Sequence, residues 1–311
     1  DQSNVTSYAA TAVAIVTLEA FAGMWINAFI VSMICIAWVK KETLNSNEKI
    51  LLLLGCSRFG YLCIGWVYYF LSVIYPKYLQ VHAIFPLVES AQSFCNCTNF
   101  WVSTCLCVFY CIKIANFRNS FFIYLKVRIE RIVPWLLLGS LLSSLVVGIL
   151  VYDVTDKVLC KNISLTSQGI IWKASIRIDE HFVTSFFIIG FVFATSFTAV
   201  TISALLLLFS LWRHKRNMQT NSMKDLSMDA HIKAMKSILS FLVMYNIHLV
   251  CFTLTMVYAL KGQNNVMFLI YVFLYAFPGV HSLILIFSNP KLEKTMLRIL
   301  AFVKCKVCTK Q

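Results

Sequence analysis

Seven long apolar runs divide the chain, and only short polar or basic segments separate most of them. A helix rises 1.5 Å per residue, so about 20 apolar residues cross the roughly 30 Å hydrocarbon core of a bilayer. The longest predicted external loop, residues 153–180, is too short to hold a soluble domain. The pattern predicts an all-α membrane protein in which residues 1–311 form a single domain, a seven-transmembrane helix bundle. The predicted spans cover residues 8–39, 50–75, 83–112, 132–152, 181–212, 232–259 and 266–288.

A shorter amphipathic segment follows the last run. Asn289-Pro290 ends the run, and residues 291–303 then mix charged and apolar side chains. The apolar side chains recur at helical spacing, which predicts a short amphipathic C-terminal helix that lies along the membrane surface and contacts lipid. The residues that share this apolar face are Leu292, Met296, Ile299 and Val303.

Composition and charge agree with a membrane protein and indicate its orientation. Of the 311 residues, 59% are hydrophobic and 13% charged, whereas a soluble domain has about 25% charged residues. The net charge of +14 is scattered between membrane-length runs, so we expect no nucleic acid partner. With the N-terminus outside, 20 of the 27 Lys and Arg fall in cytoplasmic segments and 6 outside, as the positive-inside rule requires. We expect a multi-pass plasma membrane protein with an extracellular N-terminus and a cytoplasmic C-terminus.

Two N-glycosylation sequons fit this orientation. Asn4-Val5-Thr6 and Asn162-Ile163-Ser164 both fall on the extracellular side, where glycosylation occurs. A third match at Asn96 lies within a predicted span and is interpreted as a chance match. Asn162 and Asn4 are therefore the expected glycosylation sites.

The third run carries a polar stripe on one side of its predicted helix. Steps of three and four residues place the stripe on one face, and lipid does not tolerate such a face. It must look into protein or a water-filled cavity, whereas the other end of the helix is basic and aromatic. This asymmetry indicates a signal carried across a membrane. The stripe consists of Glu89, Gln92, Ser93 and Asn96 and continues through Asn99 and Ser103.

Arg58 lies inside the second run, where its guanidinium cannot shed its charge and needs hydrogen-bond acceptors. Asn27 in the first run and His281 or Ser282 in the seventh are the candidates. Two interpretations stay open: a network that only joins packed helices, and a network that switches between two arrangements.

Several motifs, in order and at matching spacing over almost the whole chain, closely resemble those of vertebrate bitter taste receptors, the type 2 taste receptors. Rhodopsin-like signatures such as Asp-Arg-Tyr and Asn-Pro-x-x-Tyr are absent from the corresponding places. The family's proline in the fifth span is also missing, because Ser196 stands there, which predicts a straighter fifth helix. The motifs include Glu19-x3-Gly23-x3-Asn27, Ser57-Arg58, Phe109-Tyr110-x-x-Lys113-Ile114-Ala115-Asn116-Phe117, His231-x-Lys233-Ala234-x-Lys236-Ser237 and Phe277-Pro278-x-x-His281-Ser282.

The resemblance implies a G-protein-coupled receptor that binds extracellular bitter small molecules and activates a gustducin-type, inhibitory-class heterotrimeric G protein. It implies pocket positions at Asn96, Tyr69, Tyr245, Phe252 and Tyr271. Spacing alone adds His248 and the stripe residues Glu89, Gln92 and Ser93, of which Glu89 would attract cationic ligands if ionised. Each of these groups has a plainer interpretation, in which it only packs or bonds with neighbouring helices.

Two further roles follow from the resemblance. Asn27, Arg58, Tyr245, Pro278, His281 and Ser282 are the expected switch and network residues, although Tyr245 suits plain core packing equally well. A cytoplasmic face would dock the G-protein α subunit, although positive-inside bias and anionic lipid also account for its basic residues. The residues of this face are Tyr110, Lys113, Lys126, Arg128, Leu207, Ser210, Leu211, His214, His231, Lys233 and Lys236.

Three alternatives were weighed against this interpretation. Another short-looped chemosensory receptor, such as a type 1 vomeronasal pheromone receptor, would share the span pattern, but the motif that opens the sixth run favours bitter taste. A transporter predicts inverted repeats and Gly- or Pro-broken helices, and ten Gly and five Pro give little sign of them. An enzyme is disfavoured because no nucleophile–base set or metal-ligand cluster appears, and no metal or cofactor is expected.

Overall fold

The computed structural model describes residues 2–74, 84–115, 119–166, 180–220, 239–251, 253–254 and 264–308. All regular structure in these ranges is helical, so the protein is an all-α membrane protein. Six helices contain stretches long and apolar enough to cross a bilayer, which makes it multi-pass. A shorter apolar helix, Leu239–Cys251, is the described part of the sixth predicted run. The labelled helices are α1 (Gln2–Lys41), α2 (Ser46–Ile74), α4 (Ile84–Ile114), α5 (Ser120–Thr166), α6 (Glu180–Thr220), α8 (Asn264–Ser288) and α9 (Pro290–Cys308).

The helices α2, α4 and α8 match their predicted spans to within four residues at each end. In contrast, α1 begins six residues before its predicted span, α6 ends eight residues after its own, and α5 is much longer than the run of residues 132–152. The prediction of a loop over residues 153–180 is wrong in its first part, because α5 continues to Thr166. Hydropathy marks only the apolar middle of this helix. Beyond the middle, Lys157 Nζ lies 2.7 Å from Asp153 Oδ2, one helical turn away, and such a pair supports a helix in water.

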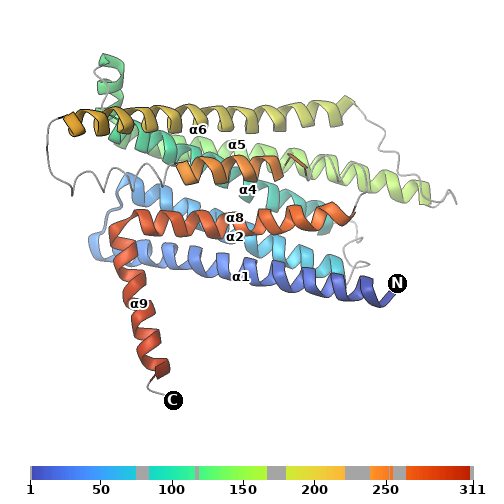
Figure 1. Ribbon diagram of the computed structural model, residues 1–311. Helices are drawn as coiled ribbons and strands as arrows, with labels where there is room; N and C mark the ends of the chain where they lie inside the picture. Colours follow the sequence, from blue (N-terminus) through green and yellow to red (C-terminus); the bar gives the residue numbers. More distant parts are fainter. Residues whose placement is uncertain are drawn as a thin grey trace.

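The long helices run side by side, and α4 lies at the centre of the bundle (Figure 1). It packs against α2, α5 and α6. In the most apolar stretch of α4, 72% of the residues are buried, compared with 50% in α2 and α8 and 33% in α1, α5 and α6. A helix that is covered on all sides can carry polar side chains, because other helices rather than lipid satisfy them.

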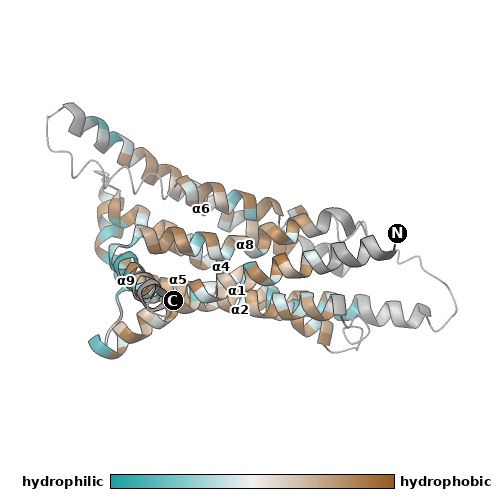
Figure 2. Ribbon diagram, turned by 60° about the horizontal axis from the view of Figure 1, so that its bottom comes forward, coloured by the Kyte–Doolittle hydropathy of each residue, from teal (hydrophilic) through white to brown (hydrophobic). Residues whose placement is uncertain are grey.

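Hydrophobic residues predominate along most of the bundle (Figure 2), and many of the large ones face outward. Large side chains such as Trp25, Val39 and Phe187 are 77%, 83% and 69% exposed. A water-soluble protein rarely leaves so much apolar surface uncovered. Lipid is the solvent that suits this surface, which agrees with the span lengths.

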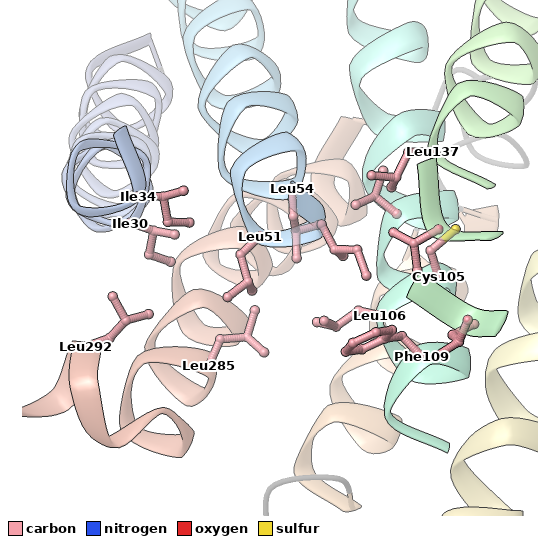
Figure 3. Close-up of a cluster of buried hydrophobic side chains, with 14 of the residues drawn as sticks. Ile30, Ile34, Leu51, Leu54, Cys105, Leu106, Phe109, Leu137, Leu285 and Leu292 are labelled. Carbon is pink, nitrogen blue, oxygen red and sulfur yellow. The ribbon is translucent and has the colours of Figure 1, made fainter. Parts of the chain in front are cut away.

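A hydrophobic cluster joins six helices, α1, α2, α4, α5, α8 and α9, near the end of the bundle where α9 leaves it (Figure 3). Ile30 and Ile34 come from α1, and Leu106 and Phe109 from α4. Leu292, the third residue of α9, is 5% exposed and anchors α9 to this cluster. Further along α9 the apolar Leu297, Ile299 and Leu300 are about half exposed. The predicted amphipathic helix is therefore present, and only its first turns pack on the bundle.

Close approach of α1 and α8 depends on two glycines. A Cβ atom on Gly23 would lie 3.6 Å from the Gly279 Cα atom and 2.7 Å from the Leu62 Cδ1 atom. Small residues at such a crossing let two backbones pack directly. The crossing brings Asn27, one turn after Gly23, toward Ser282 on α8.

Candidate functional site

Arg58 is the centre of the polar network inside the bundle, and its side chain is completely buried. Its Nε donates to Asn99 Oδ1 over 2.8 Å, and its Nη1 donates to Ser282 Oγ over 2.8 Å. Its Nη2 donates to Ser103 Oγ over 3.4 Å and to His281 Nδ1. These bonds satisfy four of the five N–H groups of a guanidinium.

The network extends from Arg58 to α1 through Ser282. The Ser282 hydroxyl accepts from Arg58 and donates to Asn27 Oδ1 over 2.7 Å, and Asn27 Nδ2 donates to the Gly23 carbonyl over 2.8 Å. Asn27 was expected to contact Arg58 directly, but the structure makes the connection indirect. No carboxylate of the described residues forms an ion pair with Arg58. Neutral dipoles from α4 and α8 hold the charge instead.

The polar stripe of α4 divides into two parts. Asn99 and Ser103 face Arg58, whereas Asn96 Oδ1 lies 3.3 Å from His248 Nε2 on the helix Leu239–Cys251. The His248 ring stacks on Phe277, with centroids 4.2 Å apart, and its Nδ1 has no hydrogen-bond partner among the described residues. Glu89, Gln92 and Ser93 are half-buried. The structure thus brings Asn96 and His248 into contact, and these two buried side chains, referred to as the polar wall, join α4 to the helix Leu239–Cys251.

Tyrosines gather beside the half-buried part of the stripe. The rings of Tyr69 and Tyr271 lie 5.9 Å apart, and those of Tyr271 and Tyr275 6.4 Å apart. Gly65 makes room for this group, because a Cβ atom there would lie 2.5 Å from the Tyr275 hydroxyl and 3.0 Å from Gln92 Nε2. Tyr275 is buried, whereas Tyr69 and Tyr271 are half-buried.

A cavity of about 210 Å³ lies at the opposite end of α4. Most of its lining is apolar, and His281 of the Arg58 network also contributes. Of the predicted docking residues, Tyr110 and Leu207 line the cavity, while Leu211 is buried beside Leu207. The lining consists of Leu51, Leu106, Cys107, Tyr110, Ile114, Leu207, Phe241, His281, Ile284, Leu285, Ser288 and Asn289.

A hydrogen bond and an ion pair join α4 to neighbouring helices at this end. The Tyr110 hydroxyl donates to Asn47 Oδ1 over 3.1 Å, which joins α4 to α2. Lys113 Nζ lies 2.6 Å from Glu130 Oε1, which joins α4 to α5, and 5.1 Å from the centroid of the Phe109 ring. Lys126 and Arg128 are exposed on α5. Ser210 is buried on α6 rather than open to the surface.

Some predicted residues lie outside the structural description. Phe252, His231, Lys233 and Lys236 fall outside the described residues. The backbones of His214, Asn4 and Asn162 are helical, but their side chains are not described. The roles of these seven residues stay predictions.

The sequence pattern did not predict the contacts of three other polar residues. Asn99 and Ser103 were part of the stripe, but periodicity did not reveal that they meet Arg58 rather than a cavity. Ser196 was noted only as a missing proline, yet its hydroxyl contacts both Thr104 and Tyr245. No sequence signal distinguishes a hydroxyl that bonds within its own helix from one that bonds across helices.

The arrangement defines a class of protein before any comparison is made. A multi-pass helical bundle holds the contact between Asn96 and His248 in one half, the buried Arg58 network in the middle and a mostly apolar cavity at the other end. The class that this layout defines is a polytopic helical membrane protein.

Comparison with known proteins gives the family. The family model described as Taste receptor protein (TAS2R) matches residues 5–304. Human taste receptor type 2 member 9 is 32% identical over 287 residues, covering 91% of both chains. Rat taste receptor type 2 member 41 is 34% identical over 302 residues, covering 93% of this chain and 95% of the relative. The chain belongs to the type 2, or bitter, taste receptor family, and it is a receptor rather than an enzyme.

Proposed function

We propose that this chain is a seven-span G-protein-coupled receptor of the plasma membrane that detects bitter small molecules outside the cell. It activates a heterotrimeric G protein of the gustducin, inhibitory class on the cytoplasmic side. The observation that carries the proposal is that the central helix α4 contributes to both functional ends: Asn96 to the polar wall and Tyr110 to the apolar cavity. Family membership favours this function over a vomeronasal receptor or a transporter.

Two observations support the proposed number of spans and the proposed orientation of the chain in the membrane. Six helices are long and apolar enough to span the membrane, and the proposal takes the shorter apolar helix Leu239–Cys251 as part of a seventh span. The bias of 20 to 6 in Lys and Arg favours an extracellular N-terminus and a cytoplasmic C-terminus. In this orientation the α9 helix lies at the inner leaflet, where its exposed apolar side chains contact lipid.

The ligand occupies the outer half of the bundle, between the polar wall and the tyrosines. Asn96 and His248 supply hydrogen bonds, and Tyr69 and Tyr271 supply aromatic walls. A mostly aromatic site with a few polar anchors suits amphipathic small molecules. Gln92, Ser93, Tyr245 and the undescribed Phe252 complete the proposed lining.

Glu89 directs the site toward cationic ligands. It forms no ion pair with a basic side chain of the described residues. A carboxylate beside tyrosine faces attracts an organic cation through charge and cation–π contacts. Alkaloids that carry a protonated amine are therefore the preferred ligands in this proposal.

The cavity at the cytoplasmic end is the docking site of the G-protein α subunit. In this proposal a helical segment of the partner, about 10–12 Å in diameter with its side chains, enters the cavity after it has widened. Outward movement of the helix Leu239–Cys251, which supplies Phe241 to the lining, would provide the space.

The test is agonist-dependent nucleotide exchange on the purified receptor in lipid nanodiscs. We expect at least one member of a panel of bitter compounds to accelerate nucleotide exchange on gustducin. An Asn96→Ala variant should lose potency toward that compound by about tenfold, since a ligand hydrogen bond is worth about 1 kcal/mol or more. A chain that is folded and yet activates no heterotrimeric G protein with any compound would disprove the proposal.

A further inference from the structure

Three buried hydroxyl groups form a chain across the middle of the bundle. The Ser196 Oγ atom on α6 lies 2.8 Å from the Tyr245 hydroxyl and 2.7 Å from Thr104 Oγ1 on α4. Thr104 Oγ1 also lies 2.9 Å from the carbonyl oxygen of Phe100. Ser196, Tyr245 and Thr104 are 0%, 1% and 4% exposed. The chain links α4, α6 and the helix Leu239–Cys251.

The donor directions in this chain follow from counting protons. Each hydroxyl has one proton to donate, and the Phe100 carbonyl can only accept. The complete arrangement is therefore Tyr245 to Ser196, Ser196 to Thr104, and Thr104 to the Phe100 carbonyl. Every proton finds an acceptor in surroundings of low polarity, where such bonds reinforce one another.

Ser196 differs from the other hydroxyl residues around it on α6. Thr195 donates to the Phe191 carbonyl and Thr198 to the Ala194 carbonyl, both within the same helix. This is the usual arrangement for Ser and Thr inside a helix. Ser196 instead connects two other helices, so its hydroxyl fixes the position of one helix relative to another.

The Tyr245 ring lies between the two ends of the proposed receptor. Its centroid is 5.2 Å from that of Phe100, which is 4.8 Å from the His248 ring of the polar wall. On the other side it is 5.8 Å from Phe241, which lines the cytoplasmic cavity and packs 4.5 Å from His281. A displacement of Tyr245 would therefore change the packing of these rings toward both ends of the receptor.

We propose that Ser196 and Thr104 are positioning residues that hold Tyr245, and with it the helix Leu239–Cys251, in the closed arrangement until an agonist breaks the hydroxyl chain. This inference rests on the proposed function. It assigns the hydroxyl chain to the inactive side of a two-state equilibrium, so any change that removes the chain shifts the population toward the active state.

The primary test measures nucleotide exchange on gustducin without agonist, using purified full-length receptor at matched concentrations of folded protein. Ser196→Ala removes the central hydroxyl, and Tyr245→Phe removes the first donor. Each should raise basal exchange about three- to tenfold, because one net hydrogen bond is worth about that factor in an equilibrium. Thr198→Ala, which removes a hydroxyl bonded within the same helix, is the matched control and should leave basal exchange unchanged.

A double-variant cycle separates the chain from general damage. Ser196→Ala combined with Tyr245→Phe should give little more than either change alone, because both break the same bond. A purely structural role would lower the amount of folded receptor and the maximal agonist response, without raising basal exchange. Thr104→Val offers a second route if the Tyr245 variant fails to fold.

Hydrogen–deuterium exchange of residues 239–251 gives a readout that needs no G protein. We expect faster exchange in Ser196→Ala than in the wild type and in Thr198→Ala. Unchanged or lowered basal nucleotide exchange in both Ser196→Ala and Thr104→Val overturns the inference, even if hydrogen exchange rises. A wild-type response to agonist in the same assay shows that such a failure belongs to the hydroxyl chain and not to the proposed function.

Discussion

Arg58 and Lys113 are both cations on helices of the bundle, and they are stabilised in opposite ways. Arg58 is completely buried, and four hydrogen bonds to neutral groups hold it. The Lys113 side chain is 53% exposed and forms an ion pair with Glu130, itself 50% exposed. Water already stabilises Lys113, so its partner adds little. Arg58 is shielded from water, so only these acceptors stabilise its charge. Each of them therefore contributes to the stability of the fold.

The largest expected effect follows from removing the buried charge. Arg58→Met leaves acceptors on α4 and α8 without their donor, and a buried polar group without a partner costs about 1–3 kcal/mol. We expect almost no folded receptor at the cell surface and a large fall in the thermal unfolding temperature in detergent. Arg58→Lys should be intermediate, because an ammonium cannot match the fork of a guanidinium. Normal surface expression and signalling of Arg58→Met would show that the network is dispensable.

A smaller effect is expected when one acceptor is removed. Asn99→Ala leaves Arg58 Nε without its 2.8 Å partner, and a hydrogen bond to a charged group is worth about 1.5–3 kcal/mol. The measurement is thermal unfolding of the purified receptor. Asn246→Ala is the matched control, because among the described residues that amide donates only to the Leu242 carbonyl of its own helix. Equal losses in both variants would mean that Asn99 does not stabilise the charge.

Asn96, one turn from Asn99 on the same helix, should behave differently. Asn96→Ala removes a bond to a histidine ring rather than to a guanidinium, so we expect a loss of stability of about 1 kcal/mol. Its main effect should be on agonist potency. Suppose that Asn96→Ala lost as much stability as Asn99→Ala and that agonist potency was unchanged. Asn96 would then belong to the Arg58 network and not to the polar wall of the ligand site.

The smallest effect is expected at the exposed pair. Glu130→Gln breaks the ion pair with Lys113, and such pairs contribute about 0.2–1 kcal/mol. The difference in unfolding temperature between wild type and variant should shrink further as salt is raised, because exposed charges are screened. A loss of stability in Glu130→Gln as large as that in Asn99→Ala would show that the exposed Lys113 depends on its partner as strongly as the buried Arg58 does.

Much of the fold followed from local patterns. The apolar runs placed most of the helices, because span length is dictated by bilayer thickness. They failed for α5, whose charged ends lie outside the apolar stretch. The stripe on α4 correctly indicated a side that lipid cannot cover, and this helix is the most buried of the six long helices that the structure describes.

The need of Arg58 for acceptors could be read from the sequence, because a guanidinium keeps its charge wherever it is placed. The family motifs and the charge bias that orients the chain are also visible there. In contrast, helix packing brings Asn99 and Ser103 to Arg58, and it makes Ser196 join Thr104 to Tyr245. Helical period fixes which residues share a face, but the rotation and crossing of neighbouring helices decide which faces meet. Those rotations depend on packing across the whole bundle, such as the contact of Gly23 with Gly279.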